Sequence, residues 1–123
     1  MVNPDLTIPG RDDVFVVGDL AALNGADGKL LPGVSQVAMQ QAKCAADNIV
    51  ATIAGRPRQA FKYRDLGSMA TIGRHRAVGD LGWIRLRGYV AWWGWLLLHI
   101  FWLIGFRNRL SVMTQWAFSY MTY

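Results

Sequence analysis

The sequence predicts an α/β fragment: a strand, a loop and a long helix, followed by a short β-hairpin and two C-terminal helices. Three observations carry this prediction. A β-branched run at residues 13–19 ends in Gly-Asp, apolar residues recur at helical spacing from Val34, and residues 89–106 form a nearly uncharged run. The length of 123 residues suits one domain or part of one.

The first strand is predicted from the sequence of residues 13–19, which reads Asp-Val-Phe-Val-Val-Gly-Asp. A continuous apolar run of this kind is typical of a strand buried on both faces, as in a parallel sheet. Residues 1–13 are polar and contain Pro4, Pro9 and Gly10, so we expect a lead-in loop there. Residues 20–33 have the glycine and proline content of a second loop.

The long helix is predicted from residue spacing. A set of apolar residues falls on one helical face: Val34, Val37, Ala38, Ala42, Ala45, Ala46, Ile49 and Ile53. This pattern indicates an amphipathic helix of about twenty residues, and Gly55 followed by Pro57 is a stop signal. Strand, loop and helix together make half of a βαβ layer.

A β-hairpin is expected after the helix, because residues 68–78 and 83–87 contain short β-compatible runs. Residues 79–82, which read Gly-Asp-Leu-Gly, would form the turn between the two strands.

The apolar run of residues 89–106 contains only one ionisable residue, His99. Eighteen helical residues extend about 27 Å, just short of a bilayer core of about 30 Å. Tryptophans are spread along the run and arginines flank both of its ends: Trp92, Trp93, Trp95 and Trp102, with Arg85 and Arg87 before and Arg107 and Arg109 after. Residues 107–123 follow with an amphipathic pattern, so we favour two helices lying in the membrane plane. A single transmembrane helix and a buried core helix remain the alternatives.

Charge is divided unevenly along the chain. Residues 1–55 hold six acidic and three basic residues, whereas residues 56–123 hold ten basic and two acidic ones. Basic charge beside apolar aromatic residues suits an anionic membrane better than nucleic acid, and we expect no nucleic-acid partner. The single cysteine, Cys44, excludes an internal disulfide and a cysteine-based metal cluster, and we assign no metal site. The first ten residues lack the pattern of a signal peptide.

Three motifs resemble those of one protein family. Residues 35–40, Ser-Gln-Val-Ala-Met-Gln, resemble the Ala-Gln-x-Ala-x-Gln helix start of type II NADH dehydrogenases, with Ser35 in place of alanine. Residues 61–73 resemble the segment after that helix, and residues 103–109, Leu-Ile-Gly-Phe-Arg-Asn-Arg, resemble the C-terminal membrane region. The chain is thereby identified as similar to the C-terminal portion of a type II enzyme, a flavoprotein of the pyridine nucleotide-disulfide oxidoreductase-like superfamily.

The resemblance implies a fold and a domain division. Residues 1–55 would be the last strand and helix of an FAD-binding Rossmann-like domain, residues 56–87 a connecting segment with the hairpin, and residues 88–123 two membrane-anchoring helices. The implied function is part of an FAD-dependent NADH:quinone oxidoreductase, which passes electrons from NADH through FAD to a membrane quinone. It would act at the cytoplasmic face of the inner or cytoplasmic membrane, as a peripheral (monotopic) protein, with a homodimer through its C-terminal region as a further expectation.

The resemblance also implies roles for individual residues, none of them catalytic. Contacts to the flavin would come from Gly18, Asp19, Ser35, Gln36 and Val37. Asp19 would bind the ribityl hydroxyls, and the helix N-terminus would favour the negative charge of the reduced flavin. The quinone site would include Gln36, Gln40, Met69 and Ile72. The membrane anchor would include Trp92, Trp93, Trp95, Trp102, Arg107 and Arg109.

The chain contains no Gly-x-Gly-x-x-Gly turn, which the family uses to bind FAD and NADH. We therefore expect the isolated chain neither to hold FAD nor to oxidise NADH. The alternative functions are a non-enzymatic membrane-binding module and a small single-span membrane protein.

Overall fold

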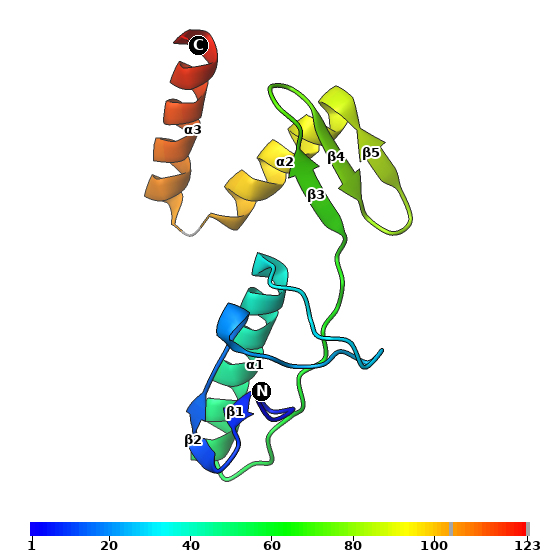
Figure 1. The fold of residues 1–123 in the computed structure, drawn as a ribbon. Coiled ribbons are helices and arrows are strands. Elements are labelled where there is room, and N and C mark those ends of the chain that lie inside the picture. The colour runs from blue at the N-terminus through cyan, green and yellow to red at the C-terminus, as the bar shows by residue number, and fades with distance from the viewer. Residues whose placement is uncertain (104, 123) are drawn as a thin grey trace. The chain divides into compact units, whose positions relative to one another are not determined.

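The computed structural model describes residues 1–103 and 105–122 and divides the chain into two compact units (Figure 1). Unit 1 is Met1–Asp65 and unit 2 is Leu66–Tyr123. The predicted division at residues 55 and 87 stays a prediction, and each unit is described by itself.

Unit 1 consists of a small sheet and one long helix. Strands β1 (Thr7–Ile8) and β2 (Arg11–Phe15) pair antiparallel, a 3-10 turn η1 (Gly18–Leu20) follows, and helix α1 spans Ser35–Ile53. The core is formed by Leu6, Leu23 and Ala45, with Phe15, Val17 and Phe61 among the residues packed around it.

The strand differs from its prediction in pairing and position. It begins at Arg11 within the expected lead-in loop and pairs with β1 in an antiparallel hairpin rather than a parallel sheet. Pro9 and Gly10 form the hairpin turn, and Gly10 adopts a φ of 79°. Residues 11–13 are exposed and residues 14 and 15 are half-buried, so the expected burial on both faces is also absent.

Helix α1 confirms the predicted helix, because it starts and ends within a residue or two of the predicted bounds. Its end is set by Gly55, which adopts a φ of 66°. The N–H of Gly55 donates to the carbonyl of Thr52 at 3.1 Å, and the N–H of Arg56 donates to that of Ala51 at 2.8 Å. This pair of bonds is a Schellman motif, which satisfies carbonyls at the helix end.

The buried face of α1 is not the apolar face that residue spacing predicted. The buried residues are Val37, Gln41, Ala45 and Asn48, two of them polar. Ile49 and Ile53, expected on the inner face, are 43% and 83% exposed. The prediction failed because it placed polar residues on the solvent side, whereas Gln41 and Asn48 are hydrogen-bonded inside unit 1.

Unit 2 is a three-stranded antiparallel sheet with two helices (Figure 1). The strands are β3 (Ser68–Thr71), β4 (Ala77–Asp80) and β5 (Arg85–Arg87), and the helices are α2 (Gly88–Trp102) and α3 (Phe106–Thr122). The predicted hairpin is thus a meander of three strands, because residues 72–76 form a second turn within the first expected strand. Helix α2 packs on the sheet through a buried cluster of Ala77, Ala91 and Trp92.

The apolar run is shorter as a helix than the eighteen residues expected. Helix α2 has 15 residues, which extend about 22 Å. Gly105, with a φ of 83°, precedes α3, and Ile104 of the C-terminal motif lies outside the described residues. Within residues 1–103 and 105–122, no helix combines the length and the hydrophobicity that crossing a bilayer requires.

Candidate functional site

The turn at Gly18 is held against the second turn of α1. Gly18 has a φ of 72°, a conformation that favours glycine, and its N–H donates to Oε1 of Gln41 at 2.7 Å. A Cβ added to Gly18 would lie 3.6 Å from Cβ of Ala38. The helix therefore fixes the backbone at the point where the strand region ends.

Asp19 lies beside the start of α1. A Cβ added to Gly33 would lie 3.2 Å from Oδ1 of Asp19, so the carboxylate sits against the residues that lead into the helix. The helix starts after Val34, which has extended backbone and no side-chain cap. The partial positive charge of a helix N-terminus favours nearby negative charge, so this end of α1 suits Asp19 and an anionic ligand group.

The predicted flavin contacts therefore lie together in unit 1. Asp19 and Ser35 are exposed, and Gly18 and Gln36 are half-buried. Val37 is only 4% exposed, so it contributes packing to this region.

Gln41 belongs to the same region but was not predicted. Its side chain is fully buried, and its Nε2 has no hydrogen-bond partner among the described residues. An unpartnered buried amide is costly, so Gln41 is retained here at the expense of stability. The signal in the sequence is weak: Gln41 is four residues from both Val37 and Ala45, which are buried on the same face.

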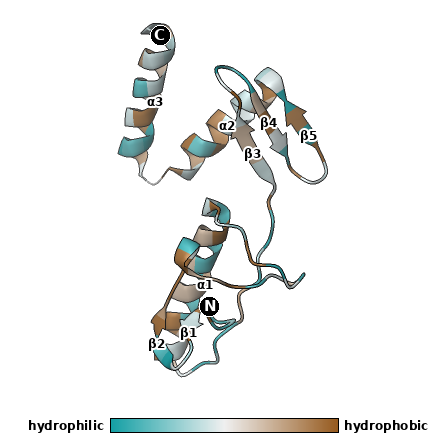
Figure 2. Ribbon diagram, in the orientation of Figure 1, coloured by the Kyte–Doolittle hydropathy of each residue, from teal (hydrophilic) through white to brown (hydrophobic). Residues whose placement is uncertain are grey.

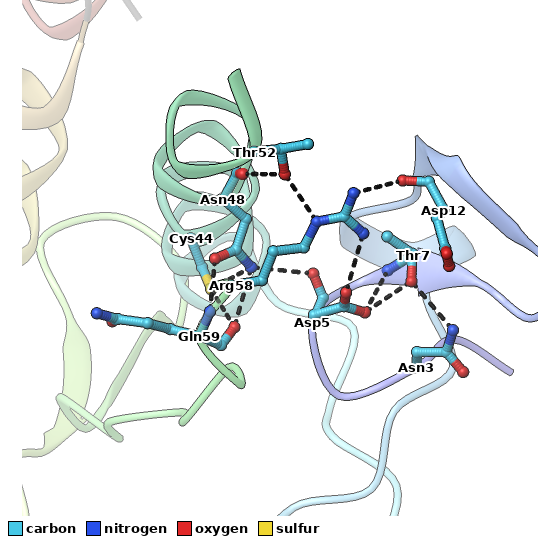
Figure 3. A network of polar contacts seen from close by, with 9 residues as sticks. All are labelled: Asn3, Asp5, Thr7, Asp12, Cys44, Asn48, Thr52, Arg58 and Gln59. Atoms are coloured by element: carbon cyan, nitrogen blue, oxygen red, sulfur yellow. Dashed lines mark hydrogen bonds and ion pairs between the residues drawn. The ribbon is translucent and has the colours of Figure 1, made fainter. Parts of the chain in front are cut away.

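Asn48 ties three segments of unit 1 together (Figure 3). Its Nδ2 donates to the carbonyls of Asp5 at 3.2 Å and Gln59 at 2.9 Å, and its Oδ1 accepts from the N–H of Gln59 at 2.8 Å. Because Asn48 is 1% exposed, these bonds replace solvent for its whole amide. The N-terminal segment and the segment after the helix are thereby fixed to α1.

Arg58 joins the same network from the other side (Figure 3). Its guanidinium donates to Oγ1 of Thr52 at 2.8 Å, to Oδ2 of Asp5 at 3.2 Å and to the carbonyl of Asp12 at 2.8 Å. It also lies 5.2 Å from the ring centroid of Phe15. Five donors in a planar fork allow one arginine to bind all three acceptors.

The network lowers the pKa of the Asp5 carboxyl below its ordinary value. Partial burial alone would raise this pKa. The hydrogen bonds from Thr7 and Arg58, together with the charge of Arg58, outweigh that effect, because they stabilise the ionised carboxylate.

The predicted quinone residues are divided over the units. In unit 1, Gln40 bonds the backbone of Arg64 in both directions: its Nε2 donates to the carbonyl at 2.9 Å and its Oε1 accepts from the N–H at 3.0 Å. Gln40 thus holds the segment after the helix in place. In unit 2, Met69 is half-buried on β3, where its side chain covers Gly79, and Ile72 is 61% exposed.

The tryptophans predicted as membrane contacts have different environments. Trp92 is 5% exposed and packs in the core of unit 2. Trp95 stacks on His99 and Trp116, with ring centroids 4.0 and 5.8 Å away. Trp93 is 44% exposed, and Trp102 is half-buried.

The two flanking arginines also differ. Arg109 closes the end of α2, because its guanidinium donates to the carbonyls of Phe101 and Leu103 at 2.7 Å each. A cation at this position also complements the helix dipole. Arg107 is exposed.

Exposed apolar side chains form a stripe along each C-terminal helix. On α2 the stripe is Val90, Trp93, Leu97 and Phe101, and on α3 it is Phe106, Leu110, Met113 and Met121. Both sets follow helical spacing, and Figure 2 shows hydrophobic colouring on α2. Contiguous exposed apolar surface of this kind marks an interaction face.

The net charge of the chain lies entirely in unit 2. Seven basic and seven acidic residues balance in unit 1, whereas unit 2 holds six arginines and one aspartate, a formal net charge of +5. That aspartate, Asp80, forms an ion pair with Arg85 at 3.1 Å. Among the described residues, no group of three or more His, Cys, Asp or Glu could hold a metal ion.

Comparisons with known proteins agree with the motifs. Residues 66–122 match the family model for the NDH2 C-terminal domain. The chain is 44% identical to the type II NADH:quinone oxidoreductase Ndh and 43% identical to NdhA, both of Mycobacterium tuberculosis, over 98% of the chain and 26% of each relative. It is 31% identical to the internal alternative NAD(P)H-ubiquinone oxidoreductase A1, mitochondrial, of Arabidopsis thaliana, over 94% of the chain and 26% of that protein. The chain spans about a quarter of the length of these relatives.

Proposed function

The chain belongs to the family of type II NADH:quinone oxidoreductases, whose C-terminal portion it corresponds to, and on this premise we propose that it supplies one wall of a flavin site and a membrane-facing surface. The reaction is the transfer of electrons from NADH to a quinone. FAD would supply the redox chemistry, and the residues of this chain would supply position and electrostatics.

The flavin wall is supported by one relationship above all: Asp19 and the first turn of α1 lie together, with Gly18 fixed between them. Asp19 would accept hydrogen bonds from ribityl hydroxyls, since its carboxylate is exposed. The start of α1 would stabilise negative charge on the flavin. These residues fit a dinucleotide of this kind, because Gly18 and Gly33 leave the backbone open to close approach.

For the quinone, the proposal keeps Gln36 as the hydrogen-bonding group and Met69 and Ile72 as apolar contacts. Gln40 contributes indirectly, since both ends of its amide are bonded to Arg64. A quinone offers two carbonyl acceptors, and the Nε2 group of a glutamine can donate to one of them.

We assign membrane association to unit 2. The observations in its favour are the apolar stripes on α2 and α3 and the net charge of +5. A surface that combines apolar side chains with basic charge suits the interface of an anionic bilayer. Lipid contact would fall on Trp93 and the stripes, while Trp92 and Arg109 hold the unit together.

A chimera tests the enzymatic proposal. This chain would replace the aligned portion of M. tuberculosis Ndh, which is 44% identical to it. We expect the purified chimera to carry flavin and to reduce a soluble quinone with NADH. Asp19→Ala should lower the flavin-to-protein absorbance ratio, and the matched Asp27→Ala, on the exposed loop before α1, should leave it unchanged. A folded chimera without flavin would refute the proposal.

A further inference from the structure

The turn between β3 and β4 carries a cluster of positive charge. It contains Arg74 and Arg76 and no acidic residue. The one acidic residue of unit 2, Asp80, is bonded to Arg85. Arg76 has no ion pair among the described residues. The turn is therefore a local centre of uncompensated charge in unit 2.

His75 fixes this turn in place. It has a φ of 58°, which residues with side chains rarely adopt. Its ring packs among Trp92, Tyr120 and Tyr89, with centroid distances of 5.0, 5.2 and 6.3 Å. Unfavourable backbone conformations persist where packing imposes them, and they concentrate at binding sites. The two arginines are thereby held against α2 and α3.

A cavity of about 300 Å³ opens beside the turn. Its apolar walls include the indoles of Trp92, Trp95 and Trp116, and its polar rim includes Thr71, Arg74 and Ser119. The Arg74 guanidinium lies 5.8 Å from the ring centroid of Tyr120 and donates to the carbonyl of Ser119 at 3.5 Å. The volume is at the lower end of the range for small-molecule sites.

We propose that this cavity binds one acidic phospholipid. The phosphate would lie on Arg74, with Arg76 adding to the positive potential, and the first part of an acyl chain would lie along the three indoles. The chemistry requires both parts, since the rim is cationic and the walls are apolar. The inference rests on the membrane association proposed above, and it deepens that proposal by naming the lipid class and the site.

The first test compares vesicle binding by two matched variants. Vesicles of phosphatidylcholine alone and with phosphatidylglycerol would be used with Arg74→Gln and with Arg87→Gln, an exposed arginine on β5. One arginine on a non-specific basic surface contributes about fivefold to acidic-vesicle affinity. Arg87→Gln should lose about this factor, and Arg74→Gln should lose more than about tenfold. Equal losses in the two variants would overturn the proposal.

The second test locates the lipid. Dihexanoyl phosphatidylglycerol, below its micelle-forming concentration, would be titrated while the indole N–H signals are followed by NMR. We expect the signals of Trp92, Trp95 and Trp116 to shift, and that of Trp83, 85% exposed outside the cavity, to stay constant. Dihexanoyl phosphatidylcholine should act more weakly, and inorganic phosphate or hexanoate alone should have little effect.

The outcomes separate this site from the broader proposal. Equal shifts with phosphate alone would mean a simple anion site, and equal shifts with hexanoate would mean a fatty-acid site; either overturns the phospholipid assignment. Uniform shifts of all indoles would also overturn it. Loss of binding to every vesicle, with the cavity shifts intact, would refute membrane association and leave the lipid site standing.

Discussion

Oε1 of Gln41 accepts a hydrogen bond of 2.7 Å from the backbone N–H of Gly18, 23 residues away in the sequence. The bond joins the buried face of α1 to the turn that carries Asp19. It makes the geometry of the proposed flavin wall a property of unit 1 itself, because both residues belong to Met1–Asp65.

Replacing Gln41 should weaken unit 1. In Gln41→Ala the N–H of Gly18 loses its acceptor, and the free energy of unfolding should fall by about 1–3 kcal/mol. Gln41→Met should cost less, because methionine fills the volume and removes the unpartnered Nε2. Urea unfolding followed by circular dichroism measures both. Lys43→Ala, exposed on the same helix, is the control and should change stability by less than about 0.5 kcal/mol. Equal midpoints for Gln41→Ala and the control would contradict the prediction.

The Asp5 carboxyl should make the stability of unit 1 depend on pH in the acidic range. Its pKa in the folded chain lies below the ordinary value of 3.8, so its contribution is fully present above about pH 5 and is lost as the pH falls through the folded pKa. Asp5→Asn should therefore be less stable than the original chain at pH 7, and the difference should shrink towards pH 3. Denaturation midpoints across this range test it, and a constant difference would show that Asp5 does not titrate with folding.

Sequence reasoning predicted the parts of this molecule that depend on local signals. Helix α1 has regular apolar spacing and a Gly-x-Pro stop, so its bounds followed from neighbouring residues. The buried roles of Gln41 and Asn48 depend on partners 23 and 43 residues away, which no local pattern reveals. The turn at residues 72–76 was missed for a similar reason: its positive-φ position is His75, held by packing against α2 and α3 rather than by a turn-forming sequence.

The start of β3 should tolerate no side chain at Gly67. Its φ is 91°, and an added Cβ would overlap the carbonyl oxygen of Asp80 and lie 2.7 Å from Cα of Leu81. Both neighbours are backbone atoms that cannot rotate away, so Gly67→Ala should destabilise unit 2 by about 3 kcal/mol or more. Gly73→Ala is the matched control: its φ is 80° but the space around it is open, so only the backbone strain of about 1 kcal/mol should appear. Thermal unfolding of the two variants should rank them in this order, and the reverse order would exclude the register described for β3 and β4.

The apolar stripe on α2 should control vesicle binding if unit 2 is the membrane-facing surface. Leu97 is 61% exposed at the middle of the stripe, and Leu97→Glu would place a charge where acyl chains are expected. We expect at least a tenfold loss of binding to phosphatidylglycerol-containing vesicles in a flotation assay. Ile53→Glu, at an 83% exposed position of α1 in unit 1, adds the same charge outside the proposed surface and should bind like the original chain. Because both variants change the net charge equally, a similar loss in both would mean that overall charge, and not the α2 stripe, governs binding.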